Sequence, residues 1–204
     1  MEPDEPLLTP ELLELIKASG HKFCSSGYDR VLLDEARLSA ERAEVARQVG
    51  DTRHERGASA SAVLCSAAAC EARLSEYLAH WEFASGPLPE DLEGIRKVWD
   101  AREQWRILIK NRAPEFELGS SREYLRFGCL LRLRDLVAHR NARLQRIGDV
   151  PNRISDCVRQ GVIPVAESGG DWPSIVLISP VAAWSIETCS AWLDLADQLV
   201  PLTC

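Results

Sequence analysis

Apolar residues recur at steps of three and four along most of the chain, which is the period of amphipathic α-helices. The clearest such segment runs from about residue 59 to 83, and its small side chains around Ala68 permit a neighbouring helix to approach closely. Residues 53–57 before it are expected to be a polar connection. The pattern predicts further helices over residues 28–48, 122–145 and from Ser179 to about Val200, and a shorter helix or helix pair over 92–110.

These elements predict an all-α fold, a helical bundle with an extra N-terminal helix. Residues 1–27 are expected to form an N-terminal helical extension, with a helix at 9–19 that begins at Thr9-Pro10, and residues 28–204 the bundle domain. Pro151, Pro164 and Gly169-Gly170 predict a long irregular segment over about 148–178. Within it, 162–165 and 174–178 are candidates for the two strands of a small β-hairpin.

Composition narrows the class of protein. The chain has 204 residues, 46% of them hydrophobic, so it can bury a substantial core. Its pI near 5.2 argues against a broad, non-specific nucleic-acid binder, because such binding draws on many phosphate contacts. The acidic N-terminus and the lack of a long apolar run predict a protein without a membrane partner.

The seven cysteines show no C-x-x-C pair and no spacing typical of zinc ligands or disulfides. Most fall at apolar helical positions, where a free cysteine behaves as a small buried hydrophobe. This usage predicts a reducing, cytoplasmic location, no metal site and no cofactor.

Positive charge is concentrated in one part of this acidic chain. Residues 122–146 hold seven arginines and two acids, a net charge of +5, whereas the whole chain carries −7. Arg134, Asp135 and His139 lie within two helical turns there. Asp135 and His139 are four residues apart and share a helix face, so the carboxylate can accept the imidazole N–H. Arg134 and His139 are about 140° apart around an ideal helix, so two copies facing across a twofold axis would be needed to bring both to one phosphate.

The run Arg134-Asp135-Leu136-Val137-Ala138-His139 resembles the R-x(4–6)-H motif of the HEPN superfamily. Residues 67–72, small side chains with Glu71, are similar to a pattern in an earlier core helix of such proteins, and the last helix is similar to their closing helix. The resemblance covers roughly residues 28–200, but only the six-residue motif is specific. It implies a helical bundle that forms a homodimer.

The resemblance also implies a metal-independent endoribonuclease that acts in defence or as the toxin of a toxin–antitoxin pair, with RNA and an antitoxin protein as partners. His139 would be general base or acid for attack of the ribose 2′-OH on the adjacent phosphorus, leaving a 2′,3′-cyclic phosphate. Arg134 would stabilise the phosphorane, and Asp135 would orient His139. The RNA backbone would be held by four further residues: Arg132, Arg140, Asn141 and Arg143.

Glu71 falls on or beside the buried face of its helix, where an unpaired carboxylate is costly. We expect Arg134 to be its partner, so Glu71 would have a supporting, structural role.

Two other interpretations remain open. A non-catalytic HEPN-like module would bind a nucleotide or a protein partner through residues 122–146 without using His139. A purely structural bundle would pair Arg134 with Glu71 in its interior and leave His139 in solvent.

Overall fold

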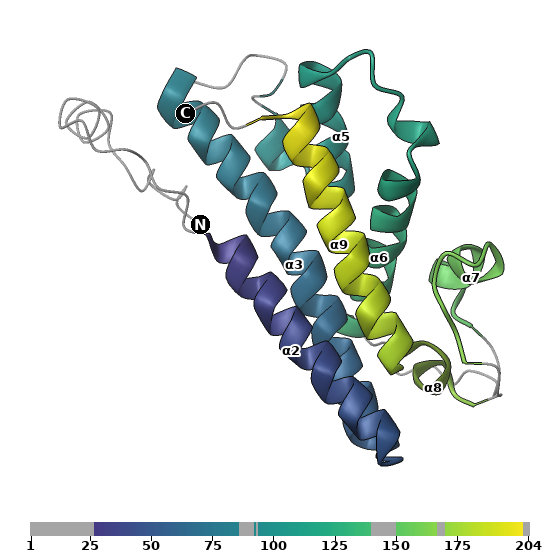
Figure 1. Cartoon of the computed structure of the whole chain (residues 1–204). Helices are drawn as coiled ribbons and strands as arrows, with labels where there is room; N and C mark the ends of the chain where they lie inside the picture. The colour runs from purple at the N-terminus through teal and green to yellow at the C-terminus, as the bar shows by residue number, and fades with distance from the viewer. Residues whose placement is uncertain (1–26, 86–91, 93, 140–149, 167–169, 202–204) are drawn as a thin grey trace, which may run out of the picture.

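The structure, a computed structural model, describes residues 27–85, 92, 94–139, 150–166 and 170–201 (Figure 1). Across these ranges it contains seven α-helices, two short 3-10 helices and no strand, which confirms the predicted all-α fold. None of the helices in these ranges is long and apolar enough to cross a membrane. The predicted N-terminal extension, 1–27 with its helix at 9–19, lies outside the described residues except for Gly27.

Four long helices make the bundle: α2 (Tyr28–Gln48), α3 (Thr52–Ser85), α6 (Arg122–Ala138) and α9 (Ser179–Leu199). The helices α2 and α3 form an antiparallel hairpin whose turn contains Gly50 at a φ of 75°, a conformation that favours glycine. The helices α3 and α9 lie side by side and run parallel (Figure 1). Their contact is made by small side chains, with Ser66 Oγ 3.2 Å from Ser185 Oγ and Cys70 Sγ 3.4 Å from Cys189 Sγ.

Helix α3 begins seven residues earlier than its apolar pattern predicts, so the expected polar connection at 53–57 is wrong. Asp51 accepts a hydrogen bond from the backbone N–H of His54 at 3.1 Å, which caps the first turn. A polar residue of this first turn also connects α3 to another helix. Glu55 is buried and accepts the backbone N–H of Ser179 at 3.0 Å, at the start of α9.

An aromatic cluster fills the core near the start of α6. Trp105 comes from α5 (Ala101–Arg112), which with the 3-10 helix Ile95–Lys97 occupies most of the region where a helix or helix pair was predicted, 92–110. The Phe127 and Trp192 rings stack with centroids 4.7 Å apart, and Trp105 meets Trp192 and Tyr77 edge to face. These three pairs lock α3, α5, α6 and α9 together.

The segment 148–178 is less irregular than predicted. It contains α7 (Asn152–Arg159) and α8 (Trp172–Val176), and among its described residues the predicted β-hairpin is not formed. A single backbone hydrogen bond, 3.0 Å long, runs from the N–H of Ala166, the residue after the first candidate strand, to the carbonyl oxygen of Ile175 in the second. Ile154, Cys157 and Val158 lie on one side of α7 and pack on the core, which is why a helix forms there.

A disulfide joins Cys129 of α6 to Cys157 of α7. The expectation that the cysteines are free is therefore wrong for this pair. The sequence pattern does not predict this disulfide, because the two cysteines are 28 positions apart and each occupies an ordinary apolar position of its helix. Cys65, Cys70 and Cys189 are free, as predicted.

Candidate functional site

The candidate site lies at the C-terminal end of α6, beside α3 and α7. The helix begins at a capped turn, in which Ser121 Oγ accepts the backbone N–H of Tyr124 at 3.2 Å. Its residues from Phe127 to Leu131 are buried, and the charged residues follow in its last two turns. The described helix ends at Ala138, seven residues before the predicted end at 145, and the remaining residues of that prediction, 140–145, lie outside the described part of the chain.

Arg134 occupies the centre of this site. Its Nη2 donates a short hydrogen bond to Glu71 Oε1 on α3, and its Nε lies 3.3 Å from Asp135 Oδ1. The pairing with Glu71 confirms the partner that the sequence predicts. The side chains of Arg134, Glu71 and Asp135 are 27%, 38% and 39% exposed. The cluster is therefore half-buried, open to water on one side and packed on the other.

The environment of this cluster shifts the pKa of Glu71. Burial raises the pKa of the Glu71 carboxyl, and the neighbouring Asp135 carboxylate raises it further, whereas the Arg134 guanidinium opposes both. Two carboxylates that share one guanidinium compete for it. The site therefore holds Glu71 closer to its protonated form than an exposed glutamate would be.

The structure adds Arg153, which sequence analysis did not single out. Its Nη1 lies 3.7 Å from Asp135 Oδ2, so α7 contributes a second arginine to the cluster. The disulfide holds α7 in this place, and Arg132 Nη1 is 3.9 Å from Cys157 Sγ. The amphipathic spacing of Ile154, Cys157 and Val158 could have predicted that α7 is a helix packed on the core, but not that Arg153 pairs with Asp135.

His139 is the C-cap residue of α6 and is exposed. Its backbone N–H donates to the carbonyl oxygen of Asp135 at 2.9 Å. The predicted contact between the Asp135 carboxylate and the His139 imidazole is not among the contacts of the described residues, because that carboxylate pairs with Arg134 and Arg153 instead.

Of the predicted RNA-binding residues, Arg132 is exposed in the last turns of α6. The other three lie outside the described residues: Arg140, Asn141 and Arg143. The structure thus brings together Glu71, Arg134 and Asp135, and it places His139 at the end of the same helix.

The functional groups gathered at the C-terminal end of α6 are mainly guanidinium and carboxylate groups. Across the described residues, no three histidine, cysteine, aspartate or glutamate side chains are grouped so that they could hold a metal ion. An arginine fork held by carboxylates is suited to a planar or tetrahedral anion that can displace them.

No protein-family model, curated protein or solved structure matches this chain.

Proposed function

We propose that the C-terminal end of α6 binds the RNA backbone and cleaves it as a metal-independent endoribonuclease, in a defence or toxin–antitoxin role. The observation that carries the proposal is the position of Arg134. It is partly exposed, it is fixed by two carboxylates, and one of these, Asp135, also joins it to Arg153 of α7. Such a group of guanidinium ions is suited to a phosphodiester, which presents two charged oxygens.

In the proposed reaction, the ribose 2′-OH loses its proton to a base and its oxygen attacks the adjacent phosphorus. The bond to the 5′-oxygen breaks, and that oxygen takes up a proton from an acid. The products are a 2′,3′-cyclic phosphate and a 5′-hydroxyl. His139 would serve as the base or the acid, because an imidazole exchanges protons near neutral pH. Arg134 would stabilise the charge that develops on the phosphorane oxygens.

Both groups can reach one phosphate only if two copies of the chain take part, since about 140° of helix rotation separates Arg134 from His139. In the proposal, Arg134 of one copy and His139 of another flank the same phosphate. Glu71 and Asp135 would keep the guanidinium oriented until the phosphate displaces them.

The test is incubation of purified protein with total RNA and a metal chelator, followed by analysis of the new RNA ends. Wild type should produce 2′,3′-cyclic phosphate ends. His139→Ala should lower the rate by roughly 100-fold or more, and Arg134→Ala should have a comparable effect. His54→Ala is the matched control, because His54 is, like His139, an exposed histidine near a helix end; its Nδ1 lies 2.6 Å from Asp51 Oδ2. It should cut like wild type.

If wild type cuts no RNA, or if His139→Ala cuts as fast as wild type, the endoribonuclease proposal is wrong. Circular dichroism and thermal unfolding of each variant would show that a loss of cleavage is not a loss of fold.

A second candidate, a non-catalytic module that binds phosphate, is favoured by one observation. The side chains of Arg134 and Asp135 are engaged with each other and with neighbours, whereas His139 meets Asp135 only through its backbone N–H among the described contacts. In that case RNA or nucleotide binding should survive His139→Ala and fall after charge reversal at Arg132 and Arg153. Filter binding of the same variants, beside the cleavage assay, separates the two functions.

A further inference from the structure

Leu32 and Leu33 of helix α2 pack against the core, but the other large aliphatic side chains of the helix and its C-cap are exposed. Val31, Leu38, Val45 and Val49 are 60%, 47%, 60% and 74% exposed. The buried face of the same helix consists of small or polar side chains: Asp29, Ala36, Ser39, Ala43 and Ala46. A helix that belonged only to this bundle would turn its valines and leucine inward. The arrangement indicates a second apolar surface on the outer side of the hairpin.

These residues form one stripe. Val31, Leu38 and Val45 follow one another at intervals of seven, which is two helical turns, and Val49 lies one turn after Val45. Most of the exposed large hydrophobic side chains of the described residues lie on α2, so they are gathered rather than scattered.

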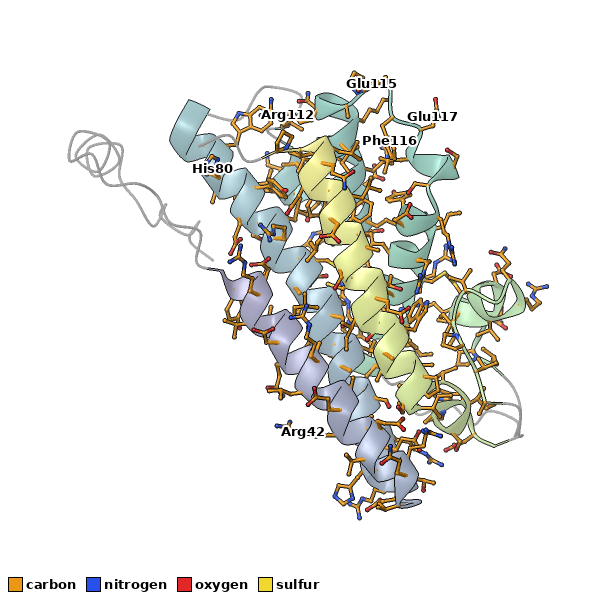
Figure 2. The ribbon with its side chains drawn as sticks, in the orientation of Figure 1. Arg42, His80, Arg112, Glu115, Phe116 and Glu117 are labelled. Atoms are coloured by element: carbon orange, nitrogen blue, oxygen red, sulfur yellow. A yellow bond between two sulfur atoms is a disulfide. The ribbon has the colours of Figure 1, made fainter. Side chains whose placement is uncertain are left out.

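The stripe continues into a groove of about 790 Å³ between the end of α2 and the start of α3. Leu38, Val45 and Val49 line one side of it, and Gly57 and Ala58 line the other. A groove formed by two packed helices accepts the side-chain ridge of a third. Its rim carries charges of both signs. Arg42 points away from the bundle on the outer side of α2 (Figure 2), and Glu41, Asp51 and Arg53 also line the groove.

We propose that this surface, the α2 stripe with its groove, binds the same surface of a second copy of the chain through an antiparallel pair of α2 helices. The spacing of the stripe is self-complementary. When Leu38 lies on a twofold axis, it meets the Leu38 of the second copy, and Val31 meets the second copy's Val45. The apolar contact is then continuous over two turns on each side of the axis.

The charges beside the stripe agree with a self-partner. Arg42 lies four residues after Leu38 and Glu35 three residues before it, so the twofold axis brings Arg42 beside the second copy's Glu35. Within one chain Arg42 Nη1 is already 3.2 Å from Glu35 Oε1, and each arginine would lie between two glutamates. On the other edge the same register brings Asp34 beside the second copy's Glu41, and Arg37, whose Nη1 is 2.7 Å from Asp34 Oδ1, offsets this pair of like charges. A rim of both signs matches its own copy better than it matches a polyanion.

The size of the surface predicts a weak dimer. Helix α2 has 21 residues and is about 31 Å long. Together with the first turns of α3 it offers roughly 600 Å² per copy, somewhat below the 800 Å² or so of a stable complex. The dissociation constant should therefore be on the order of micromolar.

This interface does not depend on the proposed function. The helix α2 packs against α3 and α9, and the candidate site lies on α6 (Figure 1). Pairing through α2 leaves the end of α6 uncovered in both copies. Contacts through α2 and through α6 are compatible, because a chain with two self-complementary faces can form a dimer of dimers.

The test is the mass of the full chain in solution, measured by light scattering or sedimentation up to about 100 μM. Wild type should reach at least twice its 22.7 kDa. Leu38→Asp, which places two carboxylates at the twofold axis, should halve the mass reached by wild type. Leu125→Asp is the control, since Leu125 is also an exposed large apolar residue but lies on α6. It should assemble like wild type.

The register is tested by cross-linking under mild oxidation, with wild type setting the background of the native cysteines. Leu38→Cys should form a covalent dimer with itself. Val31→Cys should not, but it should cross-link when mixed with Val45→Cys. A wild type that stays at 22.7 kDa overturns the proposal, as does a Leu38→Asp chain that keeps the wild-type mass. RNA cleavage by Leu38→Asp, measured separately, distinguishes this failure from failure of the proposed function.

Discussion

The two halves of α6 differ in what holds them. The first half is fixed by packing: Phe127 and Leu130 are fully buried, and Phe127 stacks on Trp192. The second half also buries Leu133, but its outer side is held by charge, with Arg134 and Asp135 partly exposed and paired to α3 and α7. Packing of rings leaves one arrangement, whereas ion pairs open to water can exchange partners at little cost. A ligand can therefore compete for the second half without disturbing the first.

The largest effect is expected from breaking the packed half. Trp192→Ala should lower the free energy of unfolding by about 3–5 kcal/mol, because it removes a fully buried ring that contacts Phe127, Tyr124 and Trp105. Urea denaturation followed by circular dichroism measures it. Leu125→Ala on the exposed side of α6 is the control and should change the free energy by less than about 0.5 kcal/mol. Equal effects from the two substitutions would contradict the assignment of the core.

The disulfide lies where the two halves of α6 meet, and its loss should have the next largest effect. Cys157→Ser should destabilise the chain by roughly 3 kcal/mol, because the bond closes a loop across 28 positions. Without the bond α7 should be released from α6, so its amide hydrogen exchange should increase and the contact between Arg153 and Asp135 should be lost. Cys65→Ser, at a half-buried free cysteine, is the control. If a dithiol reductant leaves the thermal midpoint of wild type unchanged, the bond does not contribute as stated.

Much of the helical fold could be predicted from sequence, and less of the candidate site. Helix α2 has the predicted bounds, because Gly27 and Gly50 flank it and both adopt positive φ. The start of α3 was missed because one side chain, Asp51, turns a polar segment into a capped first turn. Glu71 and Arg134 could be paired in advance, since a carboxylate on a buried face requires a cation.

Arg153 could not be found in that way. Its pairing with Asp135 depends on where α7 returns to α6, and a contact between elements separated by an irregular connection is not written in the periodicity of either one. The pairing of Cys129 with Cys157 depends on the same return. Local patterns therefore predict the elements and one strongly constrained pair, and the tertiary path decides the rest of the site.

The smallest effect concerns pH and sharpens the description of the charged half. The pKa of Glu71 is raised mainly by burial, with Asp135 adding to the effect. A carboxyl whose pKa is higher when folded binds its proton more tightly in the folded chain. Its contribution to stability is therefore full below its unfolded pKa of about 4.3 and is lost as the pH rises through the folded value.

Glu71→Gln cannot ionise and should lack this dependence. The difference in free energy of unfolding, wild type minus Glu71→Gln, should fall between about pH 4 and pH 7 by less than about 1 kcal/mol, because the group is partly exposed. Glu103→Gln is the control of opposite sign: the hydrogen bond from Arg106 lowers the pKa of Glu103, so its contribution is present above the unfolded value and lost toward acid. A difference for Glu71→Gln that rises with pH would contradict the stated environment.

The parallel contact between α3 and α9 has a consequence for synthesis on the ribosome. Ser66 and Cys70 find their partners, Ser185 and Cys189, 119 residues later in the chain. Until α9 has been translated and has left the exit tunnel, the small-residue side of α3 and the Trp105 ring have nothing to close over them. Contacts of such long sequence separation slow folding. Until α9 is available, the nascent hairpin of α2 and α3 exposes an apolar side to solvent. Chaperone binding during translation is therefore expected to concentrate on that hairpin.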